Sequence, residues 1–149
     1  MTITASGLYG LTWEKMFIDT AAQSMEAETH KVLMVTDTYA PNFDTHDFRD
    51  DITNEVTGTG YSAGGIAFTT TDWTITPAGT LTYDFADPAW PTSTIANAMA
   101  AVTYFNVGTA ATDQLLFLMD FVTAASSSGG TFTILIAATG AVTLDFTPP

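Results

Sequence analysis

Residues 72–85 carry the clearest structural signal in the chain, Asp72-Trp-Thr-Ile-Thr-Pro-Ala-Gly-Thr-Leu-Thr-Tyr-Asp-Phe85. Apolar residues alternate with polar ones, mostly threonine, on both sides of the central Pro77-Ala-Gly79. A period of two is that of a strand with one buried face, and proline with glycine favours a tight turn. The stretch therefore predicts a β-hairpin with one apolar face and one threonine face.

Strand signals continue on both sides of this hairpin. The run Lys31–Thr36 and the run Leu115–Phe121 are apolar enough for strands buried on both faces. Ser93–Val107 is the longest strand candidate, with a helix as the alternative for its first half. Residues 132–136 and 142–146 again alternate, whereas the prolines of Asp87–Thr92 predict a loop. The pattern predicts a mainly β chain, an antiparallel β-sandwich or open barrel of about seven or eight strands.

One short helix is expected near residues 45–57. Thr45 offers an N-terminal cap, Asp47 suits the positive end of the helix dipole, and glycines follow the segment. Its apolar residues are spaced at i, i+4 and i+8 on one face, namely Phe48, Ile52 and Val56. Arg49 is expected to pair with one of the acids beside it, which are Asp44, Asp47, Asp50 and Asp51.

The domain organisation is expected to be simple. Residues 13–149 show no linker and predict a single β-rich domain. Residues 1–12 contain Gly7 and Gly10 among small and apolar residues, and they predict an extended N-terminal arm. The first residues lack the basic and long apolar regions of a secretory signal, so we expect synthesis in the cytosol.

The charge is strongly one-sided, with 16 acidic residues, three basic residues and a net charge of −13. Nucleic acids and anionic membrane surfaces are bound through Lys and Arg, so neither is an expected partner. There is no run of apolar residues long enough to span a membrane. The chain has no cysteine, which excludes disulfides and thiol chemistry.

No residue pattern points to catalysis or to a cofactor. His30 and His46 do not have the spacing of metal ligands, and the Gly-x-Ser-x-Gly motif is absent. The stretch Gly58–Gly65 lacks the spacing and context of a phosphate loop and predicts a turn with glycines at positive φ. The acids at 44–51 lack the pattern of a calcium loop. We therefore expect a protein that is not an enzyme and has no metal or cofactor.

Aromatic residues supply one alternative site. Trp90 lies between Pro88 and Pro91, and an exposed aromatic ring in a β-loop can stack on a sugar or anchor an interface. Together with the nearby Tyr83, it would form a ligand-stacking platform.

As a string, Lys31–Gly65 resembles a family of small β-rich structural proteins of tailed-bacteriophage virions. Weaker similarity follows at four further stretches, Phe85–Trp90, Gly108–Thr112, Leu115–Phe121 and Gly130–Ile134. The resemblance implies a virion component, with a head decoration or cement protein as the favoured role. Residues Thr2–Trp13 do not resemble the part that the family shares.

This resemblance implies that many copies, each belonging to a trimer or dimer, bind the major capsid protein on the outer surface of the head. Assembly would take place in the host cytoplasm. The N-terminal arm would contact neighbouring shell subunits through its apolar residues, Ile3, Leu8, Tyr9 and Leu11. The alternative is a tail or head-fibre module that binds a host glycan or receptor through Tyr83 and Trp90.

Overall fold

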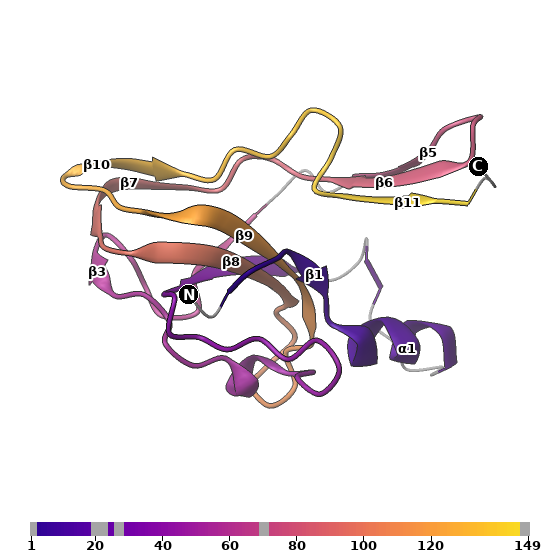
Figure 1. Cartoon of the computed structure of the whole chain (residues 1–149), viewed down its shortest axis with the longest axis horizontal. Coiled ribbons are helices and arrows are strands. Elements are labelled where there is room, and N and C mark those ends of the chain that lie inside the picture. The colour runs from indigo at the N-terminus through magenta and orange to yellow at the C-terminus, as the bar shows by residue number, and fades with distance from the viewer. Residues whose placement is uncertain (1–2, 19–23, 26–28, 69–71, 147–149) are drawn as a thin grey trace.

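A computed structural model describes residues 3–18, 24–25, 29–68 and 72–146. Within these residues the chain is mainly β, as predicted, and its sheets are antiparallel and open rather than closed into a barrel. Eight of the described strands have four or more residues, and three short ones have two. Figure 1 shows two stacked layers of strands with one helix at the side.

The first layer is a five-stranded sheet in the order β1-β9-β8-β2-β4. Strand β8 at its centre pairs with β2 along six residues and with β9 on its other side. All eight residues of β8 are buried, and so are five of the six in β2. The bounds are β1 Gly7–Leu8, β9 Leu115–Ala125, β8 Ala98–Phe105, β2 His30–Val35 and β4 Ile66–Ala67.

The second layer consists of two three-stranded sheets that lie end to end (Figure 1). One has the order β10-β7-β3, with bounds Gly130–Thr133, Ala89–Ile95 and Gly58–Thr59. The other has the order β11-β6-β5, with bounds Val142–Asp145, Thr80–Asp84 and Asp72–Ile75. Strands β5 and β6 are the predicted hairpin, and Thr74 pairs with Thr82 on its threonine face.

The predicted loop at Asp87–Thr92 is wrong, because strand β7 already begins at Ala89. Pro91 is tolerated within β7 because the pairing of β7 with β10 shifts register between Phe132 and Gly130, opposite Pro91 and Thr92, whereas Pro88 precedes the strand. Thr92 has a φ of 51° at this bulge. The single long strand predicted for Ser93–Val107 is interrupted at Asn97, where a φ of 57° turns the chain from β7 into β8.

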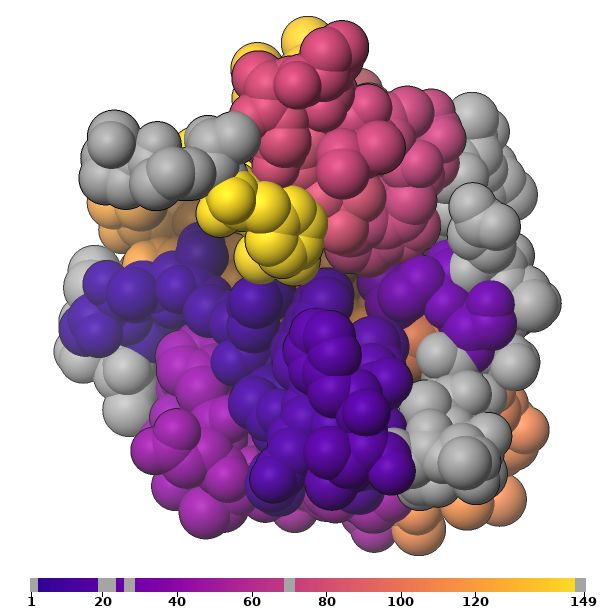
Figure 2. Space-filling view, turned by 90° about the vertical axis from the view of Figure 1, so that its right-hand side faces the viewer, coloured from indigo at the N-terminus to yellow at the C-terminus, as the bar shows by residue number. Residues whose placement is uncertain are grey.

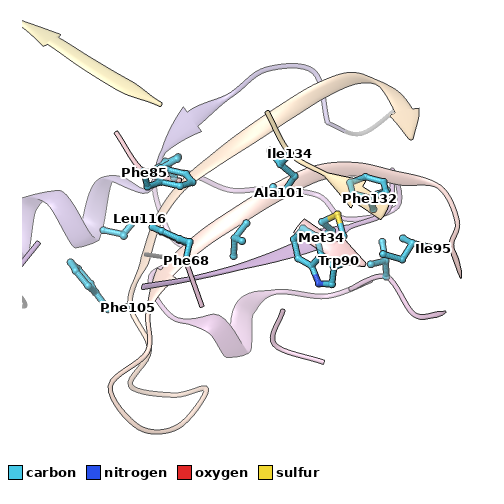
Figure 3. Packing of buried hydrophobic residues seen from close by; sticks show 14 of the residues in the cluster. Met34, Phe68, Phe85, Trp90, Ile95, Ala101, Phe105, Leu116, Phe132 and Ile134 are labelled. Atoms are coloured by element: carbon cyan, nitrogen blue, oxygen red, sulfur yellow. The ribbon is translucent and has the colours of Figure 1, made fainter. Parts of the chain in front are cut away.

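Two apolar clusters lie on the two faces of the five-stranded sheet. The cluster between the layers contains Met34, Phe85, Trp90 and Phe132; in Figure 3 Phe85 lies towards one end of this cluster and the other three lie towards the opposite end. The cluster on the opposite face contains Leu33 and Val102 of the sheet, and it is covered by Ile3, Tyr9 and Tyr39. The five-stranded sheet is therefore the middle of the molecule.

The predicted helix near 45–57 is wrong. The segment contains only a single 3₁₀ turn, Arg49–Asp51, and is otherwise extended or irregular. The Asp51 carboxylate accepts the backbone N–H groups of Asp47 and Phe48, at 3.0 and 3.2 Å, and so caps the start of this single turn. Farther along, the Val56 N–H donates to Met34 of strand β2. Backbone pairing with distant strands replaces the local helix.

Arg49 does not pair with a neighbouring acid as predicted. Its Nε donates to Asp113 Oδ2 at 2.9 Å, 64 residues away, and its guanidinium lies over the Tyr104 ring. Asp113 is fully buried, and its other oxygen accepts the backbone N–H groups of Val107 and Gly108. The ion pair joins the 49–51 turn to the loop between β8 and β9.

The predicted glycine turn at Gly58–Gly65 is confirmed at three of its glycines, since Gly60, Gly64 and Gly65 all have positive φ.

The predicted N-terminal arm is not separate from the domain. Ile3 and Tyr9 have no exposed surface, and Leu8 in strand β1 pairs with Phe117 of β9. Leu11 belongs to the helix α1, which spans Gly10–Ile18. The four residues expected to contact the shell are thus parts of the folded domain. Ile3 and Tyr9 are buried as apolar residues usually are, but they pack against the protein's own five-stranded sheet.

This packing predicts different effects for two isoleucines near the N-terminus. Ile3→Ala removes a fully buried side chain and is expected to lower the unfolding free energy by about 3 kcal/mol. Ile18→Ala alters an exposed side chain and is expected to change it by less than about 0.5 kcal/mol. Urea unfolding of the two variants measures the difference. Equal stabilities would show that the N-terminal segment is a free arm after all.

Candidate partner-binding groove

An open groove lies between helix α1 and the inner face of the β11-β6-β5 sheet. It has a volume of about 290 Å³ and is lined only by apolar side chains. Figure 2 looks at this end of the molecule, with the helix below the C-terminal strand and the β5–β6 hairpin. The lining residues are Trp13, Met16, Phe17, Met25, Trp73, Leu81, Leu144 and Phe146. We call it the helix groove.

The register of the small sheet explains why its inner face is apolar. Trp73, Tyr83 and Val142 are partners across three strands, and Ile75, Leu81 and Leu144 form the next row. Side chains two residues apart share a face, so both rows face the helix and the core. The first row packs against the core cluster, with Tyr83 fully buried. The second row lies farther out and forms part of the open groove.

Large apolar side chains are exposed around the helix groove. Phe17 on the helix is 85% exposed, and Phe146 beyond β11 is 65% exposed. Ile18 and Ile75 are also exposed. Single exposed apolar residues are common, but a group of them beside an apolar groove makes this surface a candidate binding site.

The helix is anchored so that this apolar side stays open. Trp13 Nε1 donates to the Leu116 carbonyl at 3.1 Å, and Lys15 Nζ pairs with Asp47 Oδ2 at 2.8 Å. The Lys15 ammonium therefore points towards the body of the protein. Glu14 and Asp72, which adjoin groove residues in sequence, are exposed. The surroundings of the groove are acidic, as is the protein as a whole.

His30 is the first residue of strand β2 in the five-stranded sheet, and its ring faces Tyr83 of the β11-β6-β5 sheet. Its ring contacts Phe68, Tyr83 and Phe105 with centroid separations of 5.6, 6.0 and 5.0 Å. Burial among these rings lowers the pKa of His30 to about 4. His30 is therefore neutral in the folded protein at pH 7 and joins the two layers as an aromatic ring.

The lowered pKa predicts a loss of stability in mild acid. The unfolded chain protonates His30 below its ordinary pKa of about 6.5, whereas the folded protein resists this until about pH 4. The contribution of neutral His30 to the unfolding free energy is fully present above pH 6.5 and is lost as the pH falls towards 4. Between pH 7 and pH 5 the unfolding free energy falls by roughly 2 kcal/mol for this reason.

The variant His30→Phe keeps a ring at this position and cannot be protonated. The fall in unfolding free energy from pH 7 to pH 5 is expected to be smaller than in the wild type by that amount. Guanidinium titrations at the two pH values measure it, and an unchanged fall would contradict the assignment to His30.

The predicted stacking platform is wrong. Trp90 is only 1% exposed and packs against Phe132 and Tyr61 inside the core, and Tyr83 has no exposed surface. Neither ring can stack on a glycan at the surface. The indole of Trp90 is enclosed because its segment is strand β7 of the second layer rather than a loop.

Two residues that matter in the groove, Phe17 and Phe146, were not singled out from the sequence. The available signal was the composition of residues 10–18, which has apolar residues on nearly every side of a short helix. A helix that buries only one side would then leave the rest exposed. For Phe146 the alternation in residues 142–146 predicted a strand, but not which end of its sheet is uncovered.

Chemistry-bearing groups do not gather at the helix groove. Among the described residues, no three His, Asp or Glu side chains are placed to hold a metal ion together. Three side chains form a hydrogen-bonded series on the other side of the five-stranded sheet. His46 Nδ1 is 2.9 Å from Tyr39 Oη, and Tyr39 Oη is 3.0 Å from Tyr9 Oη. No helix in the described part of the chain is long and apolar enough to cross a membrane.

Comparison of the chain with protein-family models, curated proteins and solved structures gives no match. The fold and the groove thus define a mainly β protein with an open apolar groove on its surface.

Proposed function

We propose that this protein is a non-enzymatic structural component of a tailed-phage virion. In this proposal many copies bind the outer surface of the head shell as a decoration protein, and the major capsid protein is the partner. Two things support it: the resemblance of Lys31–Gly65 to phage virion proteins, and a surface suited to binding another protein. The helix groove is the observation that carries the binding role.

The lining of the helix groove suits a protein partner. Tryptophan, phenylalanine and methionine dominate it, and these residues are enriched at the centres of protein interfaces. Met16 and Met25 can adjust their side chains to an irregular partner surface. The volume of about 290 Å³ is at the lower limit for a small-molecule site but would take a few apolar side chains.

The charge narrows the kind of partner segment. With a net charge of −13 and exposed acids at Glu14 and Asp72, the protein would attract a segment that carries Lys or Arg beside its apolar residues. An exposed apolar segment of a shell protein with basic flanks meets both requirements. The groove thereby replaces Ile3, Leu8, Tyr9 and Leu11 as the proposed contact.

The number of copies in purified particles tests the placement on the head. A decoration protein covers the whole shell, so its ratio to the major capsid protein is expected to be about one or a simple fraction such as about one half. Quantitative mass spectrometry of purified particles gives this ratio. Only a handful of copies would overturn the head-decoration role and favour a neck, tail or fibre position.

Substitutions in the helix groove test the contact itself. Both Phe17→Ser and Phe146→Ser alter exposed side chains, so the fold should tolerate them, and the double variant is expected to bind shells at least about tenfold more weakly. Co-sedimentation with shells that lack this protein measures the affinity. Val107→Ser, at an exposed apolar position that does not line the groove, is the matched control. Wild-type affinity of the double variant would rule out the groove.

A further inference from the structure

A second apolar groove lies where the edges of the two layers meet. It is lined by residues of strands β9 and β10 and of the segment after β10, and it has a volume of about 290 Å³. The lining residues are Phe121, Ala125, Phe132, Thr133, Ile134 and Leu135. We call it the edge groove. In Figure 1 strand β10 lies at the end of the second layer that is farther from helix α1.

The backbone beside the edge groove is strained at Val122. Ala98 pairs with Ala125 and Ala100 pairs with Asp120, so a single residue of β8 lies opposite the four residues 121–124 of β9. In this bulge Val122 has a φ of 65°, which is unfavourable for a β-branched residue. Glycine or asparagine adopts this conformation at a lower cost.

Burial does not explain why valine occupies this strained position. Its side chain is 70% exposed, and that of Leu135, which lines the groove, is 79% exposed. A strained position that presents an exposed apolar side chain gains nothing for the isolated fold. Such positions concentrate where a protein binds something, so Val122 and Leu135 point to a contact surface.

Charge identifies the occupant of this surface. Residues 88–112 and 121–144, which supply β7, β10 and the edge groove, contain no Asp, Glu, Lys, Arg or His. Asp120 and Asp87 border this region, and each accepts a backbone N–H, from Val122 and Ile136 respectively. Copies of a chain with a net charge of −13 repel one another except where such acids are absent.

The shape of the surface is also self-complementary. Leu135 lines the edge groove and is exposed, the exposed Val122 follows the lining residue Phe121 directly in sequence, and strand β10 is the edge of its sheet. A twofold contact brings the same patch of both copies together, so it needs a projection and a groove within one patch. The helix groove differs, because a second copy would bring its own Glu14 and Asp72 there.

We propose that two copies of this chain associate about a twofold axis through the edge groove. Val122 and Leu135 of each copy insert into the groove of the other copy. The contact leaves the helix groove free, so a dimer could still bind a partner there. The proposed dimer uses a different surface from the helix groove, so it does not depend on which partner binds there.

Sedimentation equilibrium of wild type, Val122→Gly and Val122→Asn tests the dimer. The wild type is expected to be a dimer, and both variants to dissociate with a Kd at least about tenfold higher. Because glycine relieves the strain, the thermal midpoint of Val122→Gly should not fall when both proteins are compared as monomers in dilute solution. Leu135→Ser, at an exposed position outside the bulge, is expected to weaken the dimer in the same way.

The control variant is Phe17→Ser, which alters the helix groove and is expected to dimerise like the wild type. A wild type that stays monomeric up to about 1 mM would overturn the proposal. So would a closed trimer, or variants at both Val122 and Leu135 that dimerise with wild-type affinity. Loss of the dimer with unchanged shell binding by Val122→Gly would leave the helix-groove proposal standing, so the two proposals can fail separately.

Discussion

Burial of strand β8 on both faces is the constraint on which the rest of the structure depends. Ala98, Ala101 and Phe105 belong to the cluster between the layers, whereas Val102 and Tyr104 belong to the cluster on the opposite face. A sheet with two apolar faces must be covered twice. The two small sheets cover one face, and residues 3–9 with the segment 36–52 cover the other. That requirement draws the N-terminus into the core.

The cover is incomplete at two places, and both are apolar. At one end the β11-β6-β5 sheet leaves part of its inner face open above helix α1, which makes the helix groove. Along one edge the bulge at Val122 and the segment after β10 leave the edge groove. In a chain with a net charge of −13, both grooves are apolar breaks in an otherwise acidic surface.

Local patterns predicted the strands well where the order of apolar and polar residues directly reflects which side chains are buried. The hairpin at 72–85 and the buried run at Lys31–Thr36 are confirmed, because a period of two or a continuous apolar run directly reports burial. The helix near 45–57 failed for the opposite reason. Phe48, Ile52 and Val56 have helical spacing, but the backbone N–H groups of 49 and 56 bond to residues 113 and 34. The spacing of apolar residues within a segment carries no information on backbone hydrogen bonds to residues far away in the sequence.

The sequence by itself determined the fold class, the acidic surface, the positive-φ glycine turn and the hairpin, because each follows from residue types within a few positions of one another. Only the tertiary structure decided which large aromatic residues outside the clear strand patterns are covered. Trp90 between two prolines is enclosed by the core, whereas Phe17 and Phe146 are open. It also decided that Arg49 pairs with Asp113 rather than with the acids beside it. These outcomes depend on strand order and register across the layers, and residue spacing along the chain does not encode either one locally.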